Sequence, residues 1–370
     1  MNDKVLSYFD ISADDPRWLD WKWQYANRIT DVESLAKIIN LSEKDQQGIA
    51  SCLQSFRMAI TPYFASLLDP DDPFCPLRRQ SVPSLDELAF HAAEGEDPLN
   101  EEGDSPSEDL VHRYPDRALF LVTRHCAMYC RFCVRKRLVG EEDFVINTME
   151  KNKALSYIAD TPAIRDVLIS GGDPLTIVDD ELEDIVSSLR SIPHVEIIRI
   201  GTRVPAVLPM RITADLLNML KKYQPIWVNV HFNHPRELTE LAVKACTDIV
   251  DAGIPVGNQS VLLKGVNDDP TVMRELLYKL VKARVRPYYL YQCDLIRGTS
   301  HFRTKVQTGI DIIHALTGNI TGFAVPKYVI DAPQGGGKVP INPEYVVSMD
   351  DERVVMTNYE GKTYTYPQTP

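Results

Sequence analysis

Long apolar runs and surplus basic charge are both scarce in this sequence of 370 residues. No stretch reaches the roughly 18 consecutive apolar residues that a membrane-spanning helix needs, and residues 1–18 lack the basic flank and apolar run of an export leader. The 52 acidic residues outnumber the 40 basic ones, for a formal net charge of −12, whereas general binding to polyanions needs surplus Lys and Arg. We therefore expect a cytoplasmic protein that binds neither membranes nor nucleic acid.

The cysteines lack the pattern of a disulfide framework. There are seven, an odd number, and no export signal accompanies them. Metal or redox chemistry is therefore the better expectation for at least some of these thiols. The hydrophobic content of 44% and the charged content of 25% describe a globular chain with a sizeable core, which excludes a disordered or fibrous protein.

The first ninety residues predict amphipathic helices. Trp18, Trp21 and Tyr25 recur at a spacing of three to four, and Asp15-Pro16 is a start signal for the first of these helices. We interpret the aromatic stripe as helix packing rather than as a ligand-binding face.

A strongly acidic stretch follows the predicted helices. Residues 92–110, called the acidic segment below, contain eight acids, two prolines and no base. We expect a solvated linker at 92–110, between an N-terminal helical region over residues 1–91 and a barrel over residues 111–320, with a C-terminal part over residues 321–370.

Short β-rich runs alternate with amphipathic helices from residue 118 onward. From the second run on, their starts lie about 30 residues apart, which is the length of one βα unit. Such units form a parallel sheet, and six are too few for the full eightfold barrel, so we expect an α/β fold with a partial (β/α)6 barrel and chemistry at the carboxyl ends of its strands. After Gly322 we expect one more apolar run, a glycine loop and a hairpin-like segment from Tyr345 to Tyr366 with a turn at Glu360-Gly361. The six expected strands are Ala118–Thr123, Arg165–Ser170, Val195–Ile200, Ile226–Phe232, Pro255–Leu262 and Arg286–Gln292.

Three thiols stand directly after the first expected strand. Cys126, Cys130 and Cys133 can ligate three irons of a [4Fe-4S] cubane and leave the fourth iron open. A zinc-binding interaction module is the alternative, but it needs a fourth ligand, and His125 stands too close to Cys126 to complete a tetrahedron easily. The Cys-x3-Cys-x2-Cys spacing resembles the signature of the radical S-adenosylmethionine enzymes. The resemblance implies that S-adenosylmethionine binds the open iron and is cleaved to a 5′-deoxyadenosyl radical.

The second expected strand ends in Ser170-Gly171-Gly172-Asp173. A glycine pair lets backbone approach a ligand closely, and an acid can accept from an ammonium group, although the same residues also make a good turn. At this position the stretch resembles the family's motif for the amino group of S-adenosylmethionine. Asn258 and Gln259, on the fifth expected strand, are weaker candidates for cofactor hydrogen bonds, and we assign Gln259 to the S-adenosylmethionine site.

A glycine run precedes Lys338 near the end of the chain. Val339 follows the lysine where a P-loop needs Ser or Thr, so the run is not a nucleotide-binding loop. The stretch 331–338 resembles the lysine 2,3-aminomutase family, and the similarity extends from about residue 110 to residue 366. The resemblance implies a barrel of the radical S-adenosylmethionine type with a C-terminal extension that binds pyridoxal phosphate. It also implies that Lys338 forms a Schiff base with that cofactor, and that the enzyme is an isomerase that shifts an amino group from C2 to C3 of an amino acid.

The resemblance assigns further residues to the two cofactors and the substrate. Arg135 matches the arginine that binds the substrate carboxylate, a bidentate task suited to a guanidinium group. Arg113, Tyr114 and Arg117 fall where the family lines the pyridoxal phosphate site.

Two aspartates bear on the choice of amino acid. Asp294 and Asp331 match the pair that receives the side-chain ammonium in lysine-specific members. A glutamate substrate would add a third carboxylate, at a cost of about 4 kcal/mol per pair at ~4 Å and an effective dielectric constant of ~20. We therefore favour conversion of L-lysine to L-β-lysine, with glutamate or arginine as alternatives, and Arg297 could bind an acidic side chain.

The resemblance also bears on metals and partners. Some lysine-specific members bind structural zinc through C-terminal cysteines, whereas this chain has none after Cys293, so we expect no structural zinc. The implied partners are an electron donor such as flavodoxin or ferredoxin and, without that zinc site, a homo-oligomer of undefined size.

Overall fold

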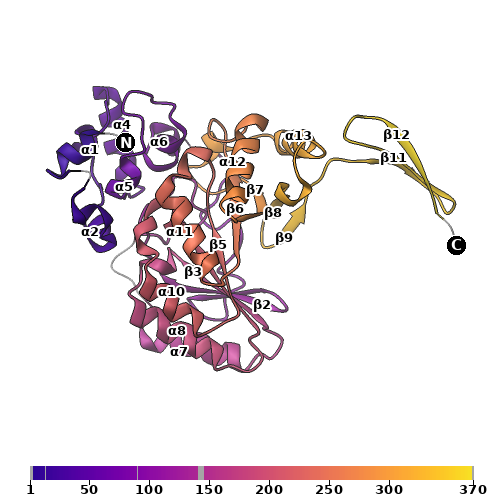
Figure 1. Cartoon of the computed structure of the whole chain (residues 1–370), viewed down its shortest axis with the longest axis horizontal. Coiled ribbons are helices and arrows are strands. Elements are labelled where there is room, and N and C mark those ends of the chain that lie inside the picture. The colour runs from indigo at the N-terminus through magenta and orange to yellow at the C-terminus, as the bar shows by residue number, and fades with distance from the viewer. Residues whose placement is uncertain (1–2, 13, 90, 141–145, 369–370) are drawn as a thin grey trace.

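The computed structural model describes residues 3–12, 14–89, 91–140 and 146–368. Its first part is a cluster of short helices that packs against one end of a central barrel (Figure 1). Asp15 caps the first turn of η1 by accepting from the backbone N–H of Arg17, and Trp18 is buried, so the predicted start signal and the predicted helix packing are confirmed. The helices of this part are α1 (Asp3–Tyr8), η1 (Pro16–Leu19), α2 (Trp21–Ala26), α3 (Val32–Ala36), α4 (Glu43–Leu53), α5 (Pro62–Ala65), α6 (Pro76–Ser81) and η2 (Leu85–Leu88).

A nine-stranded sheet in the order β1 to β9 forms the barrel. Strands β2 to β8 pair in parallel, whereas the edge strands β1 and β9 are antiparallel to their neighbours. All six expected strands are present, which confirms the partial barrel, and β8 is the expected apolar run after Gly322. The strands are β1 (Leu110–Tyr114), β2 (Arg117–Thr123), β3 (Asp166–Gly171), β4 (Ile197–Thr202), β5 (Ile226–Val230), β6 (Val256–Leu262), β7 (Arg286–Gln292), β8 (Lys327–Ala332) and β9 (Gly337–Pro340).

Aligned apolar side chains hold the sheet together. Phe120, Ile169, Ile200 and Val228 occupy successive registers on β2 to β5, and each is at most 2% exposed. At roughly 25 cal/mol per Å² of buried apolar surface, such a row stabilises the barrel by several kcal/mol. The row sets the strand register and so places the carboxyl ends of the strands at one edge.

Helices connect successive strands across the outside of the sheet (Figure 1). In α8 the buried residues Leu182, Ile185, Val186 and Leu189 follow the helical repeat, so one apolar stripe faces the strands. No described helix has the length and apolarity needed to cross a membrane. These elements are α7 (Thr148–Ala159), η3 (Pro174–Thr176), α8 (Asp179–Arg190), α9 (Val204–Val207), η4 (Pro209–Arg211), α10 (Ala214–Lys221), η5 (Pro235–Glu237), α11 (Glu240–Asp251), α12 (Pro270–Lys282), η6 (Ser300–Phe302), α13 (Val306–Leu316) and η7 (Gly322–Ala324).

The acidic segment is not the solvated linker that its composition predicts. Leu99, Glu101 and Asp109 are 9%, 6% and 3% exposed. The backbone N–H of Gly95 donates to the carbonyl of Leu295, so the segment lies against the barrel. The expectation of solvation fails because the barrel presents arginines to these carboxylates. The domain boundaries that we placed on either side of the segment stay predictions.

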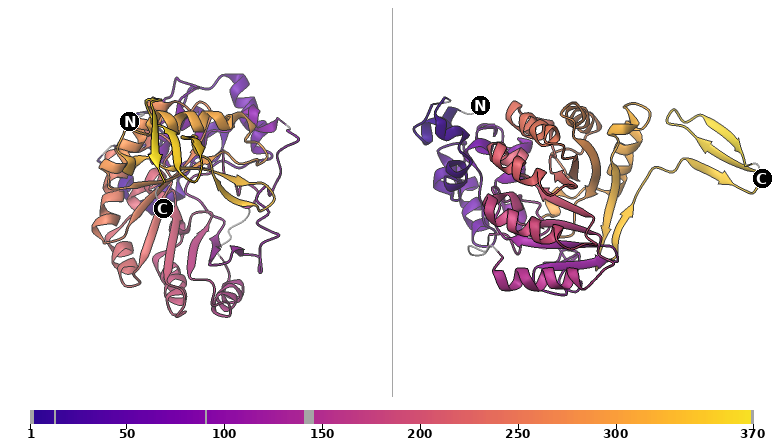
Figure 2. Two further views of the ribbon diagram at one scale, coloured as in Figure 1. Left: turned by 90° about the vertical axis from the view of Figure 1, so that its right-hand side faces the viewer. Right: turned by 60° about the horizontal axis from the view of Figure 1, so that its bottom comes forward.

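A three-stranded sheet at the C-terminus stands away from the barrel (Figures 1 and 2). It consists of β10 (Val346–Met349), β11 (Arg353–Thr357) and β12 (Thr363–Pro367). The predicted turn at Glu360-Gly361 joins β11 to β12, with Gly361 at a φ of +76° that favours glycine. The expected hairpin is thus present, and β10 extends it by one strand.

Candidate active site

The three cysteines lie on the loop that leaves the carboxyl end of β2. The N-terminal helical region holds this loop in place. Nη1 of Arg28 donates to the carbonyl of Cys126 at 2.6 Å, and the backbone N–H groups of Tyr129 and Arg131 donate to Ala59 and Gln80. The N-terminal helices therefore act on the site by fixing the backbone that carries the thiols.

The three thiols are partly buried and have no disulfide partner among the described residues. Burial raises the pKa of Cys126 well above its usual value and that of Cys133 to about 11. The guanidinium Nη1 of Arg203 donates to Sγ of Cys130 at 2.7 Å. Three thiols on one loop fit an iron–sulfur cluster, in which each thiolate binds a different iron and the metal charge favours deprotonation.

The glycine motif at the end of β3 is pressed against the cysteine loop. A Cβ on Gly172 would lie 2.1 Å from the carbonyl oxygen of His125, and one on Gly171, whose φ is +125°, would lie 2.2 Å from that of Thr123. The backbone N–H of Asp173 donates to the His125 carbonyl at 2.6 Å. The absence of side chains at these glycines therefore lets the end of β3 pack closely against the cysteine loop.

Asp173 joins the same loop to the next strand. Its buried carboxylate accepts from Oγ1 of Thr202 and from the backbone N–H groups of Arg203 and Leu175, at 2.7 to 3.1 Å. Burial raises the pKa of this carboxyl, although the hydrogen bonds oppose that shift. Its contacts within the chain therefore fix the positions of β3 and β4 relative to the cysteines.

A cavity of about 410 Å³ opens beside the glycine motif. Oγ of Ser107 and Oδ2 of Asp109 are buried there without a hydrogen-bond partner among the described residues. Unpaired buried polar atoms are costly unless a ligand or water satisfies them, so the cavity suits a polar ligand. Its walls include Thr123, Arg124, Arg135, Gly171 and Gly172.

Lys338 lies opposite Asp331 in the register of β8 and β9. Nζ of Lys338 is 3.1 Å from Oδ1 of Asp331, and it lies 5.4 Å from the centre of the Tyr291 ring. The lysine side chain is 32% exposed and the aspartate side chain is 7% exposed. This arrangement places a reachable amine beside a buried carboxylate.

Asp294 completes a cluster of two carboxylates and one ammonium. Burial raises the pKa of Asp294 to about 7, the negative charge of Asp331 adds to this rise, and Lys338 opposes it. Asp294 follows β7 and Asp331 lies near the carboxyl end of the parallel strand β8, which is why residues 37 positions apart lie near each other. A second cation would stabilise this cluster.

The edge strand β1 reaches the same lysine. The backbone N–H of Lys338 donates to the hydroxyl of Tyr114 at 3.0 Å, and the guanidinium of Arg117 stacks on the Tyr114 ring at 3.8 Å. Arg113 pairs with Asp104 and Arg117 with Asp116. The structure thus brings Tyr114 to Lys338, while the two arginines have acidic partners within the chain.

The remaining predicted residues differ in how their polar groups are used. Ser170 lies near the end of β3. Gln259 accepts a hydrogen bond from the Tyr291 hydroxyl at 3.0 Å, which links it to the lysine pocket. The Asn258 amide is buried and bonds both backbone groups of Phe232, so it joins β6 to the loop after β5.

Glu101 is a site residue that the sequence interpretation missed. Its carboxylate binds Nε and Nη2 of Arg135 at 3.0 and 2.7 Å, the bidentate arrangement that we expected for a substrate carboxylate. Asp104 and Glu108, from the same segment, each accept a hydrogen bond, from Arg113 and Arg124 respectively. The available signal was the acidic segment standing directly before an arginine-rich stretch, a charge match that we interpreted as solvation.

Replacing Glu101 with glutamine should lower the free energy of unfolding of the cofactor-free protein by about 1–3 kcal/mol, because Arg135 would keep its buried charge without a counter-charge. Chemical denaturation measures this. Glu102→Gln is the matched control, since Glu102 pairs with Arg137 but its side chain is 76% exposed, and it should cost less than about 0.5 kcal/mol. Equal losses in the two variants would contradict a structural role for the Glu101 pair.

Comparisons with known proteins place the chain among enzymes that share this layout. The family described as "Radical SAM superfamily" matches residues 120–277, and the family described as "Lysine-2,3-aminomutase" matches residues 313–370. The L-lysine 2,3-aminomutase of Clostridium subterminale is 54% identical over 100% of this chain and 88% of its own length. The enzyme of the same name from Bacillus subtilis is 50% identical over 95% of this chain and 75% of its own. The glutamate 2,3-aminomutase of Clostridioides difficile is 44% identical over 99% of this chain and 86% of its own.

Proposed function

The chain belongs to the lysine 2,3-aminomutase family of radical S-adenosylmethionine enzymes, and we propose that it converts L-lysine to L-β-lysine with the residues described above. Family membership displaces the alternative of a zinc-binding interaction module. The enzyme uses a [4Fe-4S] cluster, S-adenosylmethionine and pyridoxal 5′-phosphate as cofactors. When bound, these groups supply a hydrogen-abstracting radical and a conjugated ring that carries the migrating nitrogen.

The chain's own residues hold these groups in defined places. Cys126, Cys130 and Cys133 would ligate the cluster, and the cavity lined by Gly171 and Gly172 would hold S-adenosylmethionine. Ser170, Asp173 and Gln259 are the further residues that we assign to that site. Lys338 would bind the aldehyde of pyridoxal phosphate, with Arg113, Tyr114 and Arg117 toward its phosphate.

The two aspartates near Lys338 favour a substrate whose side chain is positively charged. Nζ of Lys338 pairs with Asp331, and the charge of this lysine also opposes the rise that burial causes in the pKa of Asp294. Once the Lys338 amine is bound to the cofactor, its ammonium no longer pairs with Asp331. A substrate with a terminal ammonium group restores that charge balance, whereas the side chain of glutamate would place a third negative charge in the pocket.

Arg135 supports binding of the other end of the substrate. Glu101 occupies Nε and Nη2 of the guanidinium, and Nη1 has no hydrogen-bond partner among the described residues. Glu101 therefore fixes the plane of the guanidinium while one N–H edge remains for the α-carboxylate of lysine. The amino acid would then span from Arg135 to the aspartates.

The rate should depend on pH through Asp294. Its pKa of about 7 is raised, so the carboxyl is protonated below that pH and the site loses its affinity for an ammonium group as the pH falls. We expect kcat/KM for lysine to fall by up to about tenfold per pH unit below a midpoint at or above pH ~7, because this ratio reports ionisation of the free enzyme. In that form Lys338 is bound to the cofactor and no longer lowers the pKa of Asp294. Asp294→Asn should flatten this limb of the profile. A limb of unchanged slope in that variant would assign it to another group.

A competition assay tests the proposed substrate. Reconstituted enzyme is incubated without oxygen with equal amounts of L-lysine, L-arginine and L-glutamate, together with S-adenosylmethionine and a chemical reductant. Mass spectrometry should detect β-lysine as the dominant product. Dominant β-glutamate or β-arginine would replace lysine with one of the two alternative substrates.

We also propose an electron donor, a cellular location and a surface for self-association. The electron donor would be a low-potential protein such as flavodoxin or ferredoxin, and the location would be cytoplasmic. A homo-oligomer would use exposed apolar surface. The projecting C-terminal sheet offers such a surface, with Val347, Met349 and Tyr366 each more than 60% exposed.

A further inference from the structure

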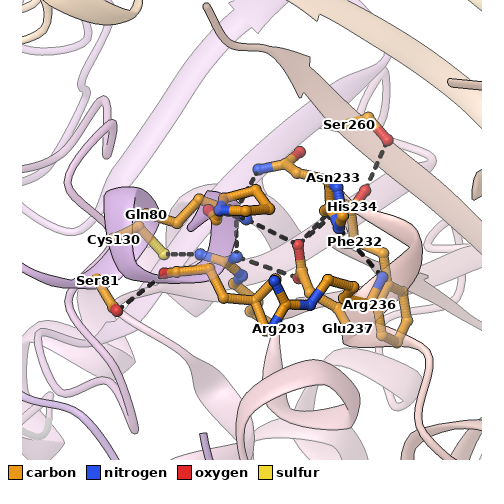
Figure 3. A network of polar contacts seen from close by, with 12 residues as sticks. Gln80, Ser81, Cys130, Arg203, Phe232, Asn233, His234, Arg236, Glu237 and Ser260 are labelled. Carbon is orange, nitrogen blue, oxygen red and sulfur yellow. Dashed lines mark hydrogen bonds and ion pairs between the residues drawn. The ribbon is translucent and has the colours of Figure 1, made fainter. Parts of the chain in front are cut away.

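A buried polar network behind the cysteine loop has no place in the substrate or pyridoxal phosphate site (Figure 3). Its centre is Arg203, which follows β4 and is 8% exposed. Gln80, Asn233 and Glu237 surround it and are fully buried. Gln80 of α6 and Glu237 of η5 contact the guanidinium group, and Asn233, from the loop after β5, donates to the same Gln80 oxygen.

The network fixes the guanidinium in one orientation. Nη2 of Arg203 donates to Oε1 of Gln80 at 2.7 Å and lies 3.2 Å from Oε2 of Glu237. Its backbone N–H donates to Asp173. The guanidinium also lies 5.2 Å from the centre of the Phe132 ring, on the cysteine loop. With Nη2 held in this way, Nη1 is directed at Sγ of Cys130, 2.7 Å away.

Other arginine–cysteine contacts in the chain differ from this one. Nη1 of Arg236 lies 3.6 Å from Sγ of Cys75, and Nη2 of Arg131 lies 3.9 Å from Sγ of Cys52. Neither Cys75 nor Cys52 belongs to the three-cysteine loop. Arg203 therefore makes the shortest of these contacts, and makes it to a thiol that we assign to the cluster.

We propose that Arg203 is a positioning residue that holds Cys130 as a cluster ligand and raises the reduction potential of the iron–sulfur centre. This inference rests on the proposed function, which places the cluster on Cys126, Cys130 and Cys133. Reduction adds one electron, taken from a low-potential donor, and so adds one negative charge to the cluster. A buried N–H donor and a positive charge at a ligating sulfur stabilise the reduced form more than the oxidised form.

Glu237 moderates this effect. Its carboxylate lies on the far side of the guanidinium and partly offsets the positive charge. Removing the carboxylate should therefore shift the potential in the direction opposite to removing the guanidinium. Loss of packing alone gives no reason for two shifts of opposite sign.

Redox titration of the reconstituted full-length enzyme, followed by electron paramagnetic resonance, tests the inference. Arg203→Gln should lower the midpoint potential by at least about 59 mV, which is tenfold for a one-electron couple. Arg203→Lys, which keeps the charge, should lower it less. Arg236→Gln is the matched control, because it removes an arginine that contacts a thiol outside the cysteine loop, and it should leave the potential unchanged.

Several outcomes would overturn the inference. An unchanged potential in Arg203→Gln with a full complement of iron and sulfide would do so while leaving the proposed function intact. If that variant assembles no cluster, Glu237→Gln provides the second measurement, and a potential that falls or stays constant there contradicts the account. A wild-type protein that binds no iron and sulfide would overturn the inference and the proposed function together.

Discussion

Replacing Lys338 with alanine should abolish both the borohydride-trapped pyridoxyl adduct and the conversion of lysine, with a loss of activity of about 10⁴-fold or more. The amine is needed to form the covalent link to the cofactor, and its position opposite Asp331 on β8 is fixed by strand pairing. Within the described chain, no other lysine pairs with these two buried carboxylates. The adduct is measured by mass spectrometry of borohydride-treated peptides.

Lys327→Ala is the matched control for this prediction. Lys327 begins β8, the strand that pairs with β9 and its Lys338, and it is exposed at the end of β8 away from Asp331. The control should keep the adduct and the activity. An undiminished adduct in Lys338→Ala would show that Lys338 does not bind the cofactor.

Neutralising the paired aspartates should have the second largest effect. Asp294→Asn or Asp331→Asn should lower kcat/KM for lysine by at least about tenfold, since a close charge pair at ~4 Å and an effective dielectric constant of ~20 contributes about 4 kcal/mol, and half of that exceeds tenfold. The double variant should lose more than either single one but less than the product of the two losses, because the carboxylates act on one ammonium group. Steady-state kinetics over a range of lysine concentrations measures these ratios.

Asp248→Asn is the control for loss of a carboxylate beside an ammonium group. Asp248 lies 2.6 Å from Nζ of Lys244 on the outer surface of α11, a pair similar in chemistry to Asp331 and Lys338. Its replacement should leave kcat/KM unchanged. If Asp294→Asn also left lysine turnover unchanged, the aspartates would not be the ammonium site.

Local patterns in the sequence predicted the barrel strands and the candidate groups. The repeat of about 30 residues follows from the length of a βα unit, so all six expected parallel strands are present in the structure. The carboxyl ends of parallel strands meet at one edge, which is why the sequence predicts Cys126 at the active edge of the sheet and predicts that Asp294 and Asp331 face one pocket.

Long-range contacts could not be predicted in the same way. The pairing of Glu101 with Arg135 depends on how the acidic segment folds over the barrel, and composition alone suggested a solvated chain. The Arg203 network joins residues 80, 130, 203 and 237, which no sequence period relates. The edge strand β1 was missed because its five residues carry two basic side chains and only two buried ones.

Turnover of L-lysine labelled with ¹⁵N at its α-amino group tests the central claim most directly. In the presence of substoichiometric S-adenosylmethionine, a reductant and reconstituted enzyme, we predict β-lysine that carries the label on C3, with many turnovers per S-adenosylmethionine. Unlabelled product, product from glutamate alone, or one 5′-deoxyadenosine released per turnover would contradict a lysine 2,3-amino shift in which S-adenosylmethionine is regenerated.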